Sequence, residues 1–452
     1  MSNEKDARQE AFAVLVKIQR RGAYSNLALD AALRQGDWDA RTSAMTCALV
    51  YGCLEHLLTL DYNLARYLRQ PLKKLSPEVL TALRIGACQL LFFDKVLPGA
   101  AVNSSVSLVK DGKFAFAAGM VNAVLRKIAA NGLRLPPEDA PEHLSVRFSV
   151  PQWLVTLWTQ GYGAEHCRGL LEAMQEPAPL VIRVNTAKTT RAALRQALAD
   201  EGVEAADDPL TPHGLRLARC GAVEKLKSFG EGLFHVQNSA SQLCCALLDA
   251  QPGERILDVC AAPGGKSFSL AMDCQNPQNP AESGQVFSCD LYESRLSLIT
   301  QGVKRLGLTN IICRIADAET ENPDFLQEKA DKVLCDVPCS GLGILRQKPE
   351  IRYKNASDID KLPDLQYRIL CSGSSSLRSG GLLVYSTCAL NPAENEQVCG
   401  RFLAQHPEFA AVSVPERLPA LAPFTQGDAP YVTLMPHIRG CDGFFLAAFR
   451  KG

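Results

Sequence analysis

Hydrophobic residues recur with helical spacing through roughly the first 135 residues of the chain. The i, i+3, i+4, i+7 pattern is clearest over residues 11–18, 80–91 and 121–128, and strand-like alternation is absent there. Prolines separate the periodic segments at Pro71, Pro77 and Pro98. Helices are expected to stop at such residues, so the pattern predicts an all-α bundle over residues 1–140.

The pattern changes in the middle of the chain. Periodicity breaks in the proline-rich stretch 133–141, and a short helical linker begins near Phe148. Residues 180–185 then read as a strand and residues 190–201 as a helix. Two short strands are expected at Val203–Ala206 and Gly214–Ala218. This β-α-β-β order predicts a small α+β module, similar in size to an RNA-recognition module, within residues 141–232. Such modules also occur in proteins that never bind RNA.

Strands and helices alternate over residues 233–452. The expected parallel strands are Arg255–Val259, Gln285–Asp290, Asn310–Ile315, Lys332–Asp336 and Leu382–Ser386. A last strand, Gly443–Phe449, is expected to run antiparallel. This alternation is typical of a doubly wound, Rossmann-like α/β sheet. The chain is therefore expected to be multidomain, with an all-α, an α+β and an α/β part.

Composition adds few constraints. The 452 residues are 47% hydrophobic and 21% charged, with 48 basic and 48 acidic residues, which argues against a uniform basic surface for nucleic acid. Residues 1–140 hold 18 basic and 13 acidic residues, a surplus of five. No apolar run could span a bilayer, and the polar N-terminus shows no secretory signal. We therefore expect a cytoplasmic monomer without membrane partners.

The chain contains 17 cysteines but no Cys-x-x-Cys pair, so no metal site is expected. Most of the cysteines have apolar neighbours and are expected to be small core residues in a reducing compartment.

A glycine-rich turn follows the strand Arg255–Val259. The segment Cys260–Lys266 reads Cys-Ala-Ala-Pro-Gly-Gly-Lys and leads into a helix-compatible stretch. This strand–turn–helix order lets the backbone approach a nucleotide-type ligand, and the start of the helix offers free N–H groups. The turn matches neither the Gly-x-Gly-x-x-Gly pattern nor the phosphate-loop pattern, so its meaning depends on the residues around it.

Acids follow four of the five expected parallel strands, at the sheet edge where ligands bind. They are Asp258, Asp290, Asp317 and Asp336. An acid after the second strand can accept hydrogen bonds from ribose hydroxyls, and one after the third can accept from an adenine amino group. Any single one could instead cap a helix. Four acids beside a glycine turn favour a ligand site.

Two cysteines are expected at the same edge. Cys339 follows the fourth strand and Cys388 follows the fifth, both on loops. A thiol in such a position can act as an exposed nucleophile, whereas a buried, inert thiol is the simpler explanation for either one alone.

Together these motifs resemble those of the RNA cytosine-C5 methyltransferases. The segments that carry the resemblance are Cys260–Lys266, Asp336–Gly341, Ser386–Cys388, Asn391–Asn395 and Asp442–Phe445. The helical N-terminus is similar to the NusB-like domain of the members that modify small-subunit ribosomal RNA, through Tyr51–Gly52, Ala82–Leu91 and Val121–Arg126.

The resemblance implies S-adenosylmethionine as the cofactor. Its expected binding residues are Cys260, Ala261, Ala262, Pro263, Gly264, Gly265, Lys266, Asp290, Asp317 and Asp336. The resemblance also implies that Cys388 adds to C6 of a cytosine, that Asp336 holds the N3/N4 edge, and that Cys339 assists release of the adduct. The implied substrate is 16S ribosomal RNA, with the target base unstacked from its neighbours.

Several alternatives stay open at this point. DNA cytosine methyltransferases use a cysteine after the fourth strand as nucleophile, so spacing alone does not separate Cys339 from Cys388. The substrate could be transfer RNA, or the chain could be a ribosome-assembly factor that binds RNA without catalysis. The cations that follow Cys339 are expected either to hold phosphates or merely to be solvated; they are Arg346, Lys348, Arg352 and Lys354.

Overall fold

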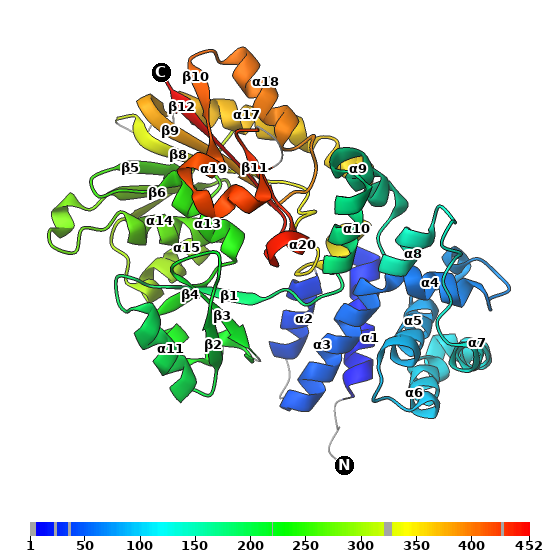
Figure 1. The fold of residues 1–452 in the computed structure, drawn as a ribbon. Coiled ribbons are helices and arrows are strands. Elements are labelled where there is room, and N and C mark those ends of the chain that lie inside the picture. The colour runs from blue at the N-terminus through cyan, green and yellow to red at the C-terminus, as the bar shows by residue number, and fades with distance from the viewer. Residues whose placement is uncertain (1–5, 22–24, 35–37, 219, 321–327, 426–428) are drawn as a thin grey trace. The chain divides into compact units, whose positions relative to one another are not determined.

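The computed structural model describes residues 6–21, 25–34, 38–218, 220–320, 328–425 and 429–452, which fold into two compact units (Figure 1). Unit 1 consists of Met1–Gln175 and Gln347–Lys354. Unit 2 consists of Glu176–Arg346 and Asn355–Gly452. The first five residues, which belong to the polar N-terminus mentioned above, lie outside the described ranges.

Unit 1 is helical throughout its described residues, as the spacing of hydrophobic positions predicted. Its α-helices are α1 (Ala7–Arg21), α2 (Ser25–Arg34), α3 (Ala40–Glu55), α4 (Leu57–Ala65), α5 (Pro77–Phe92), α6 (Pro98–Lys110), α7 (Ala118–Asn131), α8 (His143–Phe148), α9 (Gln152–Tyr162) and α10 (Ala164–Ala173). Its 3-10 turns are η1 (Leu72–Lys74), η2 (Gly112–Ala117) and η5 (Pro349–Tyr353).

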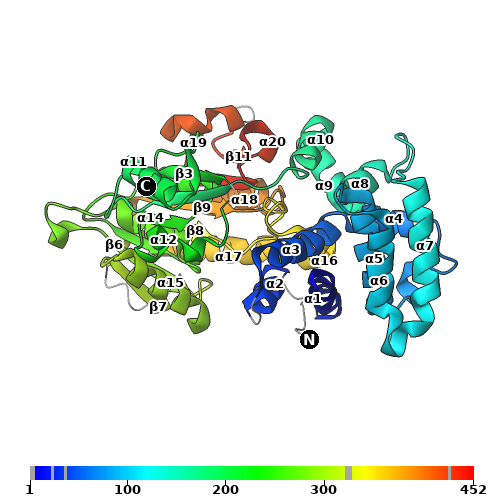
Figure 2. The ribbon, with the colours of Figure 1, turned by 90° about the horizontal axis from the view of Figure 1, so that it is seen from below.

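Helix α5 is central to the packing of unit 1. It begins at Pro77, and Ser76 caps it by accepting a hydrogen bond from the Val79 N–H at 3.4 Å. Helices α5, α6 and α7 lie side by side (Figure 2). A Cβ on Gly86 would overlap the Leu125 side chain of α7, so glycine permits this close approach in mid-helix.

A short segment from late in the chain completes unit 1. In η5, the Arg352 side chain is almost fully buried and its Nη1 donates to the carbonyl oxygens of Glu55 and Ser149 at 3.0 and 3.5 Å. The Tyr353 hydroxyl donates to the Leu54 carbonyl at 2.7 Å. Glu350 accepts from the Ser25 hydroxyl at 2.7 Å. The segment thus supplies hydrogen-bond donors to three backbone carbonyls of the helical unit, those of Leu54, Glu55 and Ser149.

Unit 2 begins with the expected small α+β module. Its sheet has the order β2-β3-β1-β4, with every pair antiparallel. The strands are β1 (Leu180–Val184), β2 (Glu204–Asp207), β3 (Gly214–Ala218) and β4 (Phe234–Val236). Strand β4 was not expected. It has only three residues, too few for an alternating pattern to be recognised.

The rest of unit 2 is built on an eight-stranded sheet with the order β10-β12-β9-β8-β5-β6-β7, and β11 pairs with β12. The strands are β5 (Arg255–Asp258), β6 (Gln285–Asp290), β7 (Ile311–Ile315), β8 (Ala330–Asp336), β9 (Leu377–Thr387), β10 (Phe409–Val412), β11 (Val432–Leu434) and β12 (Phe444–Lys451). Strands β5 to β9 are parallel to one another and β12 is antiparallel to β9, as predicted. The short strands β10 and β11 were missed.

Helices cover both faces of this sheet (Figure 1). The helices of unit 2 are α11 (Arg191–Asp200), α12 (Lys227–Gly230), α13 (Ser239–Leu248), α14 (Gly265–Asp273), α15 (Glu293–Leu306), α16 (Ala356–Ile359), α17 (Leu362–Ser375), α18 (Glu396–Gln405), α19 (Val414–Arg417) and α20 (Pro436–Arg439). Its 3-10 turns are η3 (Val223–Lys225), η4 (Pro280–Glu282) and η6 (Pro419–Phe424).

Successive residues of a strand enter different cores. Ile256 packs in the core formed with α13, α14 and α15, whereas Leu257 packs in the core formed with α17 and α18. Burial on both faces explains why these strands read as continuous apolar runs in the sequence.

Replacing Arg352 with alanine is expected to destabilise unit 1 by about 2–4 kcal/mol. The change removes a buried side chain and leaves the Glu55 carbonyl without its donor. Calorimetric unfolding should show a lower transition midpoint for Arg352→Ala, whereas Lys348→Ala, in the same segment, should leave it nearly unchanged. Equal midpoints for the two variants would contradict the assigned role.

Candidate active site

The carboxyl ends of five parallel strands lie at one edge of the large sheet. Strand β5 pairs with β6 on one side and with β8 on the other, so the order of strands reverses direction at β5. Ligands bind at such a switch point in open α/β sheets. Asp258, Asp290 and Asp336 are the last residues of β5, β6 and β8, and Cys388 directly follows β9. The structure therefore brings the residues expected from the sequence to one edge.

Backbone hydrogen bonds fix the glycine turn between β5 and α14. The Ala261 N–H donates to the Cys289 carbonyl at 2.8 Å, and the Gly264 N–H donates to the Ala261 carbonyl at 2.8 Å. Gly264 has φ of 107°, and a Cβ there would lie 2.6 Å from the Phe268 ring. Helix α14 has no side-chain cap, so the N–H groups of its first turn are available to a ligand.

Asp258 is buried beneath this turn. Its Oδ2 accepts from the Ser267 hydroxyl at 2.6 Å, and the Ser288 hydroxyl donates to the Ser267 oxygen at 2.8 Å. Burial raises the pKa of Asp258 to about 7, although the Ser267 hydrogen bond acts in the opposite direction. This acid supports the turn from inside the fold.

Asp290 and Asp317 differ in their surroundings. Asp290 is buried and accepts from the N–H groups of Ala262 and Tyr292 at 3.3 and 3.2 Å, with Arg295 Nη1 at 3.3 Å. It therefore ties β6 to the glycine turn. Asp317 is exposed and lines a small cavity of about 20 Å3 whose other lining residues are mostly apolar.

Lys266 and Asp336 form an ion pair at this edge, with Nζ 2.6 Å from Oδ2. Burial acts to lower the pKa of Lys266, but the adjacent Asp336 carboxylate outweighs this effect and raises it above its ordinary value. The Ser386 hydroxyl donates to Asp336 Oδ1 at 2.8 Å. The ammonium group also lies 5.1 Å from the centre of the Phe444 ring. Asp336 is thus fixed in place, and its side chain stays 27% exposed.

The sulfur atoms of Cys339 and Cys388 are 3.2 Å apart. The hydrogen bond to Cys388 and then burial raise the pKa of the Cys339 thiol well above its ordinary value. The other cysteines behave as expected, since none of them forms a disulfide bond and most are buried.

A buried carboxylate joins the two cysteine loops. Glu394 Oε2 accepts from the Ser340 N–H at 2.8 Å and from Gln366 Nε2 at 2.9 Å. Its Oε1 accepts from Asn391 Nδ2 at 2.9 Å. Ser340 follows Cys339 directly, and Asn391 lies three residues after Cys388. Three donors to one desolvated carboxylate hold the loops in register.

Two glycines bring a third segment against these loops. The Gly343 N–H donates to the Cys388 carbonyl, and the Gly443 N–H donates to the Gly343 carbonyl, both at 2.8 Å. A Cβ on Gly343 would overlap the Gly443 carbonyl. The segment Asp442–Phe445 is therefore packed directly against the cysteine loops.

The phosphate-binding prediction is wrong for two of the four cations after Cys339. The Arg346 side chain is buried and donates to the Cys441 carbonyl at 2.6 Å. Arg352 is buried in unit 1, as described above. Sequence reasoning also missed two supports of the site. Ser386 and Glu394 lie inside motifs that were recognised. Their hydrogen-bonding roles could not be predicted, because neither periodicity nor spacing indicates which polar side chains are buried and bonded to one another.

Within the described ranges, no group of three or more His, Cys, Asp or Glu side chains is arranged to hold a metal ion. No single described helix is long and apolar enough to cross a membrane. The bent pair α3 and α4 meets the length and composition criteria only when its two helices are counted together.

Family comparisons cover nearly the whole chain. The model of the 16S rRNA methyltransferase RsmB/F family matches residues 245–450. The NusB family model matches residues 5–130. A model of the ferredoxin-like domain of RsmF/B-like methyltransferases matches residues 150–224.

Individual proteins agree with these matches. The probable ribosomal RNA small subunit methyltransferase B of Bacillus subtilis is 34% identical, and the match covers 98% of each chain. The crystal structure of PH0851 superimposes with a TM-score of 0.82 at 25% identity and covers 98% of this chain and 99% of that one. NSun6 from Pyrococcus horikoshii, solved with SFG, has a TM-score of 0.57 at 23% identity and covers 67% of this chain and 98% of that one.

The buried Asp258 should make stability depend on pH. Its pKa is about 7 in the folded chain and near 4 when unfolded, so between about pH 4 and 7 the folded state binds more protons. Stability conferred by this group is therefore lost as the pH rises through that range, by at most about 4 kcal/mol. Asp258→Asn keeps an acceptor for Ser267 and removes this loss. The variant should unfold at a higher temperature than the parent at pH 8, with the difference shrinking towards pH 4.

An exposed carboxylate, Asp360, provides the control for this titration. Asp360→Asn should follow the parent chain at every pH. A constant offset between Asp258→Asn and the parent from pH 4 to 8 would show that Asp258 does not titrate in this range.

Proposed function

The chain belongs to the RsmB/F family of 16S rRNA methyltransferases, and from this membership we propose that it transfers a methyl group from S-adenosylmethionine to C5 of a cytosine in 16S ribosomal RNA. The family, the RNA methyltransferase activity and the NusB-like, small α+β and α/β parts expected from the sequence are confirmed. The middle part matches a ferredoxin-like domain. The cofactor, the target atom and the roles of single residues belong to the proposal. A cytoplasmic location of the protein is also proposed.

We assign the parts of the chain different tasks. Residues 1–140 bind RNA, residues 141–232 link the parts through the small α+β module, and residues 233–452 carry out the chemistry. Relatives named for the small ribosomal subunit favour ribosomal RNA over transfer RNA.

The residues at the sheet edge fit S-adenosylmethionine. The uncapped first turn of α14 offers N–H donors for a carboxylate, and the turn Cys260–Lys266 leaves the backbone accessible beside it. Asp290 has acceptor oxygens suited to ribose hydroxyls, and the exposed Asp317 suits an adenine amino group at the mouth of its small cavity. The chemistry that the cofactor supplies is an electrophilic methyl group.

The close pair Cys339 and Cys388 is the observation that carries the proposal. Cytosine C5 is too weakly nucleophilic to take a methyl group unaided, so a nucleophile must first add to C6. The family resemblance assigns the attack to Cys388, whose sulfur lies 3.2 Å from that of Cys339. The new S–C6 bond shifts the C5–C6 electron pair to C5, which can then take the methyl group while the electron pair of the methyl–sulfur bond stays with the thioether that leaves.

Asp336 and Cys339 serve the steps around that bond formation. As a carboxylate held by Lys266 and Ser386, Asp336 accepts from the cytosine N4 amino group and stabilises the proton gained at N3. After methylation the C5 proton passes to water, and the electron pair of that C–H bond restores the double bond as the Cys388 thiolate is expelled. N3 then gives up the proton that it had gained. Cys339 assists this release from its position 3.2 Å away.

The cysteine roles predict opposite results for two variants. Cys388→Ala should lower transfer of tritiated methyl groups to small-subunit RNA by at least about 1,000-fold, because the covalent step is lost. Cys339→Ala should accumulate an RNA–protein adduct that survives denaturing electrophoresis. Cys220→Ala, a half-buried cysteine of the small α+β module, is the control and should retain activity. Full activity of Cys388→Ala would refute the mechanism.

Glu394 is predicted to be a positioning residue. In Glu394→Gln one carboxylate oxygen becomes an NH2 donor. Either Ser340 and Gln366 on one side or Asn391 on the other then faces a donor in place of an acceptor. A displacement of about 1 Å can cost about 100-fold in rate, so kcat should fall by that order while KM for S-adenosylmethionine stays within about twofold. Glu396→Gln, two residues away and bonded to Thr433, should keep kcat. Equal kcat for both variants would contradict the role.

A further inference from the structure

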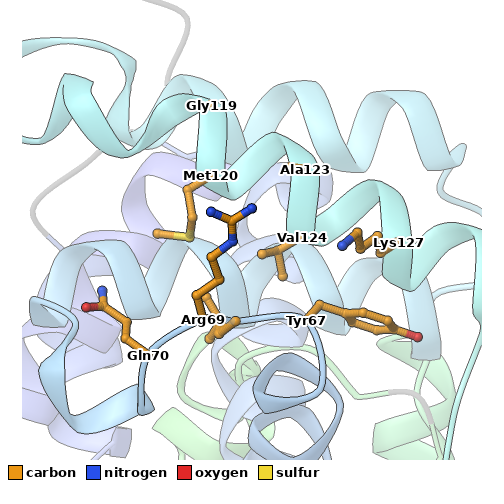
Figure 3. A pocket seen from close by; sticks show the side chains of 9 residues that line it. Tyr67, Arg69, Gln70, Gly119, Met120, Ala123, Val124 and Lys127 are labelled. Carbon is orange, nitrogen blue, oxygen red and sulfur yellow. The ribbon is translucent and has the colours of Figure 1, made fainter.

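A cavity of about 450 Å3 lies in unit 1, far along the chain from the cysteine motifs. One wall is the turn after α4, with Tyr67, Leu68, Arg69 and Gln70. The other wall is α7, with Gly119, Met120, Ala123, Val124 and Lys127. Figure 3 shows Met120, Val124 and Lys127 on the side of α7 that faces the turn, and the Arg69 guanidinium extending towards the helix. The volume falls in the range of roughly 300–1,000 Å3 found for ligand sites.

The two walls are strongly basic. Between Tyr62 and Pro77 the chain has four cations and no acid; they are Arg66, Arg69, Lys73 and Lys74. Between Gly112 and Pro137 it again has four cations and no acid; they are Lys113, Arg126, Lys127 and Arg134. These two stretches hold eight of the 18 basic residues counted above for residues 1–140. The two stretches that contribute the walls of the cavity are therefore rich in cations, and two of these cations, Arg69 and Lys127, line the cavity itself.

The cavity combines these charges with apolar surface. Arg69 and Lys127 are exposed at its mouth, and the described lining contains no carboxylate to pair with them. Val124 is buried, and Met120, Leu68 and the Tyr67 ring are half-buried. Gln70 adds an amide that can both donate and accept hydrogen bonds. The ring of Tyr67 lies beneath Lys127 in Figure 3.

We propose that this cavity binds one unstacked nucleotide of the RNA substrate, with its flanking phosphates on Arg69 and Lys127 and its base against Tyr67, Met120 and Val124. An RNA base that is not stacked offers a flat apolar face and a polar edge, between two anionic phosphates. The cavity presents the matching features in the same order: cations at the mouth, an aromatic ring and apolar side chains within, and an amide for the edge. Gln70 is the residue that reads that edge.

An acidic protein segment is the competing occupant. It would satisfy Arg69 and Lys127 equally well, but carboxylate side chains leave the aromatic and apolar lining unused. The combination of cations with an aromatic ring is typical of single-stranded RNA sites, where stacking adds to phosphate contacts. The lining therefore favours RNA.

The inference rests on the proposed RNA substrate but is tested by binding, without the chemical step. The full chain and its variants are titrated with an unmodified transcript of small-subunit ribosomal RNA in a filter-binding assay at several salt concentrations. The double variant Arg69→Ala/Lys127→Ala should bind about tenfold more weakly. The slope of log K against log salt should also become shallower, by about 1.4–1.8 for two lost phosphate contacts.

The control removes the same charge elsewhere on unit 1. Lys17→Ala/Lys95→Ala changes two exposed lysines outside the cavity and should alter the dissociation constant less than about twofold. In methyl transfer, the cavity variant should raise KM for RNA about tenfold and leave kcat within about twofold. If the cavity variant matches the control in affinity and salt slope, the cavity is not an RNA site and the proposal is overturned.

The stacking part has its own pair of variants. Tyr67→Phe keeps the ring and should bind RNA like the parent, whereas Tyr67→Leu should lose about fivefold or more in affinity. Equal affinities of Tyr67→Leu and the parent would overturn the placement of the base. A fluorescein-labelled deca-aspartate peptide tests the other occupant. If Arg69→Ala/Lys127→Ala loses the peptide but retains RNA, the cavity binds acidic protein and the proposal is wrong.

These outcomes are separate from those of the proposed function. A parent chain that binds the transcript through Arg69 and Lys127 but transfers no methyl group would refute the function and keep the RNA site. A chain that methylates the transcript while the cavity variant binds normally would refute the RNA site alone.

Discussion

Parallel pairing of β5 with both β6 and β8 is the constraint on which the catalytic unit depends. Each crossover carries the chain back to the opposite edge of the sheet, so every following parallel strand ends at the same edge as β5. Residues from Asp258 to Cys388, 130 positions apart, are thereby gathered without any local motif connecting them. The packing of apolar strands between two helical layers supplies the rigidity of this edge, and the loops supply its chemistry.

Much of this arrangement could be read from the sequence, because four of the five parallel strands end at or just before an acid. The edge strands β10 and β11 were not found, since β10 is largely exposed and β11 has three residues. Glu394 and Arg352 show a different limit. Their partners are backbone groups and side chains of remote segments, such as the Ser340 N–H and the Glu55 carbonyl, which carry no sequence signal. A buried charge is recognisable only once the fold has placed its partners.

The charged groups near the two cysteines and those that line the cavity of unit 1 differ in their exposure to water and in their partners. Near the cysteines, the charged groups of Lys266, Asp336 and Glu394 are buried or partly buried, and each has a hydrogen-bond or ion-pair partner. These partners fix the positions of the charged groups before any substrate binds. Around the cavity of unit 1, Arg69 and Lys127 stay exposed and unmatched by any carboxylate of the described lining. Groups that take part in a reaction need a fixed geometry. Side chains that bind a flexible polyanion need instead an exposed charge and enough conformational freedom to contact the phosphates.

The segment Gln347–Lys354 has a consequence for the order of synthesis. Unit 1 takes these eight residues from beyond the middle of unit 2's sequence. When the helices α1 to α10 of the N-terminal unit have emerged from the ribosome, the unit therefore still lacks the segment Gln347–Lys354. The carbonyls of Glu55 and Ser149 can accept their hydrogen bonds from Arg352 only after the strands β5 to β8 have also been synthesised. Unit 1 is thus completed only after most of the parallel strands of unit 2 have been synthesised, and neither unit is a continuous stretch of the polypeptide.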